Sequence, residues 1–134
     1  MVFPQDFTNN KREHRFPIGS LTKRILSELP EINENVFPSR SSKGTTFNGW
    51  SKSKRRFDGT ISVSNYTLHD FRRTYSSNMA RLDVPIHITE KLLNHVSGTV
   101  SSIAAVYNRY LYAEEMRKAA DNYEVFLKDI INKV

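Results

Sequence analysis

The residues with the clearest chemical potential lie in the segment Thr67–Thr74, which reads Thr-Leu-His-Asp-Phe-Arg-Arg-Thr. His69 and Arg72 are three positions apart, so on a helix they share one face. Thr67 followed by Asp70 has the pattern of a helix N-cap with a capping box, which predicts a helix beginning here. An imidazole, a guanidinium and the positive end of a helix dipole together favour phosphate binding. The alternative is a surface histidine beside exposed arginines.

A second cluster follows in Leu92–His95 and in Ala105–Tyr110, the latter reading Ala-Val-Tyr-Asn-Arg-Tyr. A tyrosine oxygen can attack phosphorus and hold a nucleic-acid strand covalently. Arginine stabilises the added negative charge in the transition state, and histidine can accept the phenolic proton or donate to a phosphate oxygen. Such chemistry requires no metal and no nucleotide cofactor, and we expect neither. The alternative is that Tyr107 and Tyr110 simply pack in a core.

These motifs, taken in order, resemble the signature of the tyrosine recombinases, and in particular the integrases of prophages and genomic islands. The matching residues are a His-x-x-Arg motif at His69–Arg72, a Leu-x-His segment at Leu93–His95, and Tyr107. The interval of 12 residues between that last histidine and the tyrosine is similar to the island-integrase branch. The segments Phe37–Ser39 and Gly49–Lys52 also resemble that branch, so the likeness extends over essentially the whole chain.

The resemblance implies a role for each matching position. Tyr107 would attack the scissile phosphate, form a 3′-phosphotyrosyl link and free a 5′-hydroxyl. Arg72 would bind the phosphate and stabilise the transition state. His69 would act as general base or phosphate ligand, and His95 would donate a hydrogen bond to the phosphate. Tyr110 is the alternative nucleophile.

The sequence also departs from the family pattern in its hairpin. The family places a lysine in the turn, where it protonates the leaving 5′-oxygen, but the matching position in Thr8–His14 is Asn9. Lys11 lies two residues further on and would face the same way on a strand, so it is the candidate substitute. His14 and His87 match no catalytic position, and both are predicted to be surface or turn residues.

A second departure concerns what lies upstream of the hairpin in the family. The first catalytic arginine and a helical core-binding domain both precede it there, so we expect both to be absent from this chain. Residues 1–134 are then an N-terminally truncated catalytic domain. Loss of one such electrostatic donor costs on the order of 10²–10³ in rate. The alternative function is therefore an inactive fragment that acts only as a weak DNA-binding or recombinase-partner module.

The charge of the chain favours a polyanionic partner. The net charge is +6, from 20 Lys and Arg against 14 Asp and Glu, which is typical of nucleic-acid binding. The segment from Asn35 to Phe57 holds six basic residues and no acidic one, which predicts salt-sensitive contacts with DNA phosphates. The alternative is a solvated loop and helix surface. The predicted DNA-contacting residues are Arg12, Arg40, Lys43, Lys52, Lys54, Arg55, Arg56 and Arg73.

Hydrophobic periodicity predicts a mainly helical α+β fold with one small antiparallel hairpin, the fold class of a tyrosine-recombinase catalytic domain. The hairpin strands are expected at Gln5–Thr8 and His14–Ile18, with the Asn-Asn of the turn in positive φ. Helices are expected over residues 20–29, 48–57, 67–82, 86–93, 101–110 and 113–131. The predicted apolar faces are Phe71, Tyr75, Met79 and Leu82 on the third helix, and Met116, Ala120, Tyr123, Phe126 and Ile130 on the last.

The composition excludes several classes of protein. The chain contains no cysteine, which excludes disulfides, thiolate zinc sites and cysteine nucleophiles. No apolar run approaches the roughly 20 residues of a membrane span, and the N-terminus lacks the pattern of a signal peptide. We therefore expect a cytoplasmic protein with no membrane partner, a monomer off DNA. Its expected partners are double-stranded DNA attachment sites and other recombinase protomers bound there.

Overall fold

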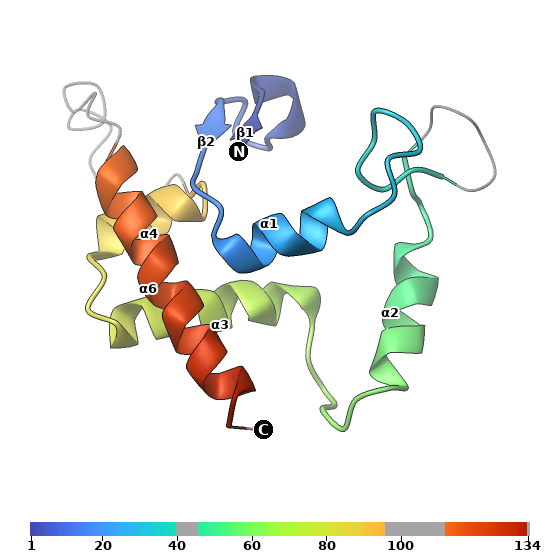
Figure 1. Cartoon of the computed structure of the whole chain (residues 1–134). Coiled ribbons are helices and arrows are strands. Elements are labelled where there is room, and N and C mark those ends of the chain that lie inside the picture. Colours follow the sequence, from blue (N-terminus) through green and yellow to red (C-terminus); the bar gives the residue numbers. More distant parts are fainter. Residues whose placement is uncertain (40–45, 96–111, 134) are drawn as a thin grey trace.

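The computed structural model describes residues 1–39, 46–95 and 112–133. These residues form helices and one two-stranded antiparallel sheet, which confirms the predicted mainly helical α+β organisation (Figure 1). The expected helix over 101–110 lies outside the described residues. The elements are β1 (Val2–Phe3), a 3-10 helix (Gln5–Phe7), β2 (His14–Arg15), α1 (Ser20–Ser27), α2 (Trp50–Asp58), α3 (Leu68–Arg81), α4 (Ile86–Leu92) and α6 (Ala113–Ile131).

The hairpin is built differently from the prediction. The expected first strand at Gln5–Thr8 is wrong, because Gln5–Phe7 forms a 3-10 helix and β1 is the strand that pairs with β2. Pro4 explains the change. Proline has no N–H to donate to a ladder but suits the start of a helical turn, and its carbonyl accepts from Phe7 N–H at 3.0 Å. The second strand is also shorter than expected and ends at Arg15, before the proline at position 17.

The turn between the strands is organised by Thr8, which is 7% exposed. The Thr8 hydroxyl accepts from the Arg12 N–H at 3.1 Å and donates to the Arg12 carbonyl at 2.7 Å. Asn10 Oδ1 also accepts from that N–H at 3.1 Å. As a result the residue in positive φ is Lys11, at 54°, and the expectation that the Asn-Asn pair would adopt this conformation is wrong.

Helix α3 begins as the sequence predicted. The backbone N–H and the hydroxyl of Thr67 both donate to Asp70 Oδ2 at 2.8 Å. These two bonds, with an ion pair to Arg73, hold the pKa of the Asp70 carboxyl below its usual range. The helix ends at Arg81, after which Asp83 adopts a φ of 55°. The cap therefore fixes where the helix begins, and with it the positions of His69 and Arg72 on its surface.

The hydrophobic core lies where α6 packs against α3 and α4 (Figure 1). The predicted faces are confirmed at Met79 of α3 and Met116 of α6, which are 0% and 6% exposed. They are wrong at Phe71 and Ile130, which are 56% and 45% exposed. The helices cross rather than run side by side (Figure 1), so only the part of each stripe near the crossing is covered. Ile88 and Ala119 complete the core.

Helix α1 is attached to α6 through one carboxylate. Glu124, whose side chain is 12% exposed, accepts from the Leu21 N–H at 3.2 Å and contacts the Ser20 hydroxyl. A Cβ atom at Gly19 would overlap this carboxylate, so glycine is required for the close approach. The Lys128 ammonium at 2.7 Å, the Ser20 hydroxyl and the Leu21 N–H lower the pKa of Glu124 to about 2.

Helix α2 stands apart from the other helices (Figure 1). None of its residues is buried, and its Trp50 and Phe57 side chains are 56% and 50% exposed. In the segments that the structure describes, no helix is both long and apolar enough to cross a membrane.

The assigned core leads to a prediction about the free energy of unfolding. Met79→Ala should lower the free energy of unfolding by about 2–5 kcal/mol, because truncation of a fully buried side chain leaves a cavity. Leu68→Ala on the same helix is the size-matched control, and with Leu68 60% exposed it should cost under about 1 kcal/mol. Urea denaturation followed by circular dichroism measures both. Equal losses in the two variants would contradict the assigned core.

The Glu124 contact predicts a stability that depends on pH. The pKa of Glu124 is lower in the folded chain than the usual 4.5, so its contribution is present above about pH 4.5 and is lost as the pH falls toward 2. Glu124→Gln should therefore be less stable than the native chain at pH 7, and the difference should shrink between pH 4.5 and pH 2. Glu114→Gln, which also removes one carboxylate from an exposed position of the same helix, is the control for the change in net charge and is measured over the same pH range in chemical denaturation. A difference that is constant with pH would refute the role of the carboxylate.

Candidate functional site

The site is organised around the C-terminal end of α4. His95 N–H donates to the Glu90 carbonyl at 2.9 Å, and Asn94 N–H donates to the Lys91 carbonyl at 3.1 Å. Asn94 itself has a φ of 53°. Together these features form a Schellman motif, in which a left-handed residue ends the helix. Asparagine is one of the few residues other than glycine that tolerates this conformation, so the local sequence fixes where His95 leaves the helix.

Arg72 reaches this end from α3. Its Nε–H donates to His95 Nε2 at 2.9 Å, and its Nη2 donates to the Leu93 carbonyl. Because Nε2 accepts a hydrogen bond, the imidazole in this contact is neutral and carries its proton on Nδ1. Two N–H groups of the guanidinium serve these contacts, so the other N–H groups remain able to bind an anion. The structure thus brings together two of the predicted phosphate residues.

The hairpin also donates to the end of α4. The Asn10 amide donates to Asn94 Oδ1 at 2.9 Å and to the Asn94 carbonyl at 3.4 Å, and the imidazole of His14 borders the same hollow as Leu92. No feature of the sequence indicated either arrangement. The expectation that His14 is a surface or turn residue is wrong, because its imidazole is half-buried and stacks on Phe16 with centroids 4.8 Å apart.

The environment of His14 keeps its imidazole neutral. Burial lowers the pKa of His14, and the positive charge of Arg72 lowers it further, while the backbone of Leu92 acts in the opposite direction. A neutral His14 avoids repulsion beside the guanidinium. Protonation of His14 is thus disfavoured beside the guanidinium of Arg72.

An open hollow of about 580 Å³ lies where these groups meet. Arg72 and His95 border it on the helical side, and Phe7 and Asn9 border it on the hairpin side. The hollow is thus lined by a guanidinium, by an imidazole whose Nδ1 forms no hydrogen bond with another described residue, and by the polar turn. This set of donors suits a phosphate or another oxyanion.

Two predicted catalytic residues lie away from this hollow. His69 is exposed in the first turn of α3, and Lys11 is exposed at the left-handed turn position. Neither borders the hollow or forms a hydrogen bond with another described residue through its side chain. His87, also half-buried, packs its ring on Tyr112 at 5.1 Å. Tyr107 and the alternative Tyr110 lie outside the described residues.

The predicted DNA-contacting residues divide into three groups. Lys52, Arg55 and Arg56 are exposed on α2, and Arg12 is exposed beside the hairpin turn. Arg40 and Lys43 lie outside the described residues.

The third group is engaged in contacts within the chain. Lys54 lies 2.7 Å from Asp58 and 4.3 Å from the centroid of the Tyr66 ring. Arg73 lies 2.9 Å from Asp70. Lys54 and Arg73 are therefore partly neutralised within the chain, whereas Lys52, Arg55, Arg56 and Arg12 form no ion pair with another described residue.

No group of three His, Asp or Glu side chains among the described residues has the arrangement of a metal site. Comparisons with protein-family models, with curated proteins and with solved structures found no match for this chain. The chemistry of the site therefore follows from its own residues and their geometry.

The Schellman motif predicts how Asn94 responds to substitution. Asn94→Gly keeps the left-handed conformation at no steric cost and loses only the contact of Asn10 with Asn94 Oδ1. Asn94→Val loses the same contact and also forces a β-branched residue into that conformation. We expect Asn94→Val to be the less stable variant by about 1–2 kcal/mol. Urea denaturation measures the difference, and NMR shifts of the His95 ring report its displacement. Equal stability of the two variants would show that the left-handed conformation does not hold His95.

Proposed function

We propose that this chain is part of the catalytic domain of a tyrosine site-specific recombinase, which cuts and rejoins duplex DNA through a 3′-phosphotyrosyl link at Tyr107. The observation that carries the proposal is the contact between Arg72 and His95. These residues are 23 positions apart, the resemblance assigns both to one phosphate, and their Nε and Nε2 atoms lie 2.9 Å apart. Unrelated exposed residues would have no reason to meet at the end of a capped helix.

The contact supports a specific division of labour. Arg72 supplies the positive charge that stabilises the added negative charge on phosphorus in the transition state. Because Arg72 Nε–H occupies His95 Nε2, the Nδ1–H of His95 is the donor available to a non-bridging oxygen. One guanidinium therefore binds the phosphate and also orients the imidazole beside it.

The reaction in this proposal exchanges one phosphodiester for another. The phenolic oxygen of Tyr107 forms a bond to phosphorus as the bond to the 5′-oxygen breaks, and the bond energy is retained in the tyrosyl ester. The phenolic proton passes to a base and the 5′-oxygen takes a proton from an acid, roles that the resemblance implies for His69 and Lys11. Both side chains lie outside the hollow, so this proposal requires them to move toward the phosphate when DNA binds. Tyr107 is 12 residues after His95 in the sequence.

A second candidate function is supported by the position of Lys11. Its side chain is exposed at the turn and does not border the hollow of Arg72 and His95, so Lys11 does not stand ready to protonate the leaving oxygen. In this case the chain binds duplex DNA, alone or beside other recombinase protomers, without cutting it. Exposed cations on α2 would then supply most of the affinity.

Covalent capture of DNA tests the proposal. The substrate is a pool of duplexes with a randomised centre, labelled at the 5′ end of one strand and nicked a few nucleotides beyond each candidate cleavage position. Cleavage releases the short fragment with its 5′-hydroxyl, so religation is prevented and the labelled strand stays on the protein. We expect a labelled adduct on a denaturing gel that disappears in Tyr107→Phe and persists in Tyr110→Phe.

The controls separate the candidate functions. Arg72→Gln should reduce the adduct about 10²–10³-fold, because it removes one electrostatic donor, while DNA binding at low salt is nearly retained. An adduct that survives in Tyr107→Phe would refute the assigned nucleophile. Retained binding of the pool with no adduct in the native chain would support the binding module and overturn the enzymatic proposal.

A further inference from the structure

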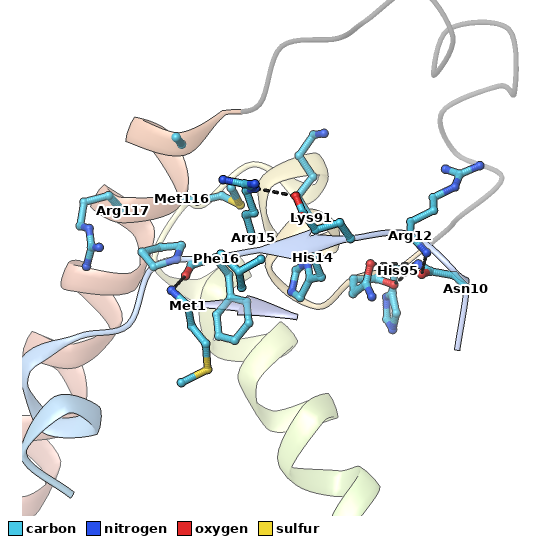
Figure 2. Close-up of a pocket in the computed structure, with 15 residues that line it drawn as sticks. Met1, Asn10, Arg12, His14, Arg15, Phe16, Lys91, His95, Met116 and Arg117 are labelled. Atoms are coloured by element: carbon cyan, nitrogen blue, oxygen red, sulfur yellow. Dashed lines mark hydrogen bonds and ion pairs between the residues drawn. The ribbon is translucent and has the colours of Figure 1, made fainter. Parts of the chain in front are cut away.

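A second hollow, of about 780 Å³, adjoins the candidate site along the hairpin. It is bordered by the hairpin, by the end of α4 and by the first turns of α6 (Figure 2). His95, Asn94, Asn10 and His14 border both hollows. The two hollows are therefore adjacent parts of one surface that continues around the hairpin.

The lining of the second hollow is strongly basic. Four cationic side chains border it, and one carboxylate, Glu13, faces them. The charged ends of Arg12, Arg15 and Lys91 project on one side of β2 (Figure 2). Glu13 is paired with Arg15 at 2.6 Å, so the acidic charge of the lining is already neutralised. The remaining cations are Arg12, Lys91 and Arg117.

These three cations differ in how they are held. Arg117 donates to the Ile18 carbonyl at 2.8 Å, which ties α6 to the hairpin. Lys91 lies 5.1 Å from the centroid of the Tyr112 ring, a contact that orients an ammonium without cancelling its charge. The Arg12 side chain forms no hydrogen bond or ion pair with another described residue. Lys91 and Arg12 therefore present uncompensated charge to the hollow.

We infer that this second hollow binds the DNA backbone next to the phosphate held by Arg72 and His95, with Lys91 as its principal phosphate contact and Arg12 as a second. The inference rests on the proposed function for the identity of the ligand. Uncompensated cations in a concave site raise the local concentration of a polyanion. Continuity with the candidate site favours a single extended ligand, which occupies both hollows at once, over a free anion that would fill one.

Salt dependence of DNA binding tests the inference, because each phosphate contact contributes about 0.9 to the slope of log Kd against log salt. We expect Lys91→Gln to lower that slope by about 0.9 for a 30-base-pair duplex, and Lys91→Arg to preserve it. The double variant Arg12→Gln, Lys91→Gln should lower it by about twice as much. Lys23→Gln, an exposed change on α1 that borders neither hollow, is the matched control and should leave the slope unchanged.

Three outcomes would overturn the inference. The first is a slope in Lys91→Gln equal to that of Lys23→Gln, with the native melting temperature retained in both. The second is an unchanged slope together with lost binding of inorganic pyrophosphate in calorimetry, which would make the hollow a site for a free anion. The third is failure of the native chain to bind duplex DNA. The two proposals can fail separately. If the Tyr107 adduct forms but Lys91→Gln and Lys23→Gln have equal salt slopes, only the inference about the second hollow is refuted. If Lys91→Gln lowers the slope but no adduct forms, only the enzymatic function is refuted.

Discussion

The arrangement of the site depends on hydrogen bonds to the last carbonyl groups of α4. A helix leaves its final carbonyls without partners inside the helix, and they carry partial negative charge. Here the carbonyls of the C-cap Leu93 and of the following Asn94 receive donors from Arg72 and Asn10 respectively. One donor comes from α3 and the other from the hairpin. Hairpin, α3 and α4 are thus joined at one point, and His95 leaves the helix there.

This arrangement also explains why so few apolar side chains are buried around the site. The core of Met79, Ile88, Met116 and Ala119 holds α3, α4 and α6 together, but the hairpin is attached mainly by polar contacts. Polar contacts fix direction and distance more narrowly than apolar ones, since hydrogen bonds weaken steeply away from linear geometry. For a site that must hold a guanidinium and an imidazole at a defined separation, directional bonds are the more suitable attachment.

The sequence predicted those parts of the fold that local rules determine. The cap of Thr67 and Asp70 and the bounds of α6 follow from side-chain chemistry and periodicity within a few residues. The role of Asn10 could not be predicted, because it depends on a carbonyl 84 positions away in the chain. The same limit applies to Phe71, whose apolar position on α3 gives no indication of where α6 crosses. The resemblance implied that Arg72 and His95 share one phosphate, but only the fold showed that the guanidinium contacts Nε2 of the imidazole.

The contact between Arg72 Nε–H and His95 Nε2 affects both hollows, because His95 borders each of them. If His95 uses Nε2 to hold Arg72, its other nitrogen is the one that can face a ligand, and protonation of the ring would place two cations side by side. The neutral state of His95 is therefore a condition for the contact, just as burial and the adjacent guanidinium keep the pKa of His14 low. Positive charge is consequently confined to Arg72 in one hollow and to Lys91, Arg12 and Arg117 in the other, with two neutral imidazoles between them. A backbone whose phosphates are regularly spaced matches such separated charges better than one compact anion does.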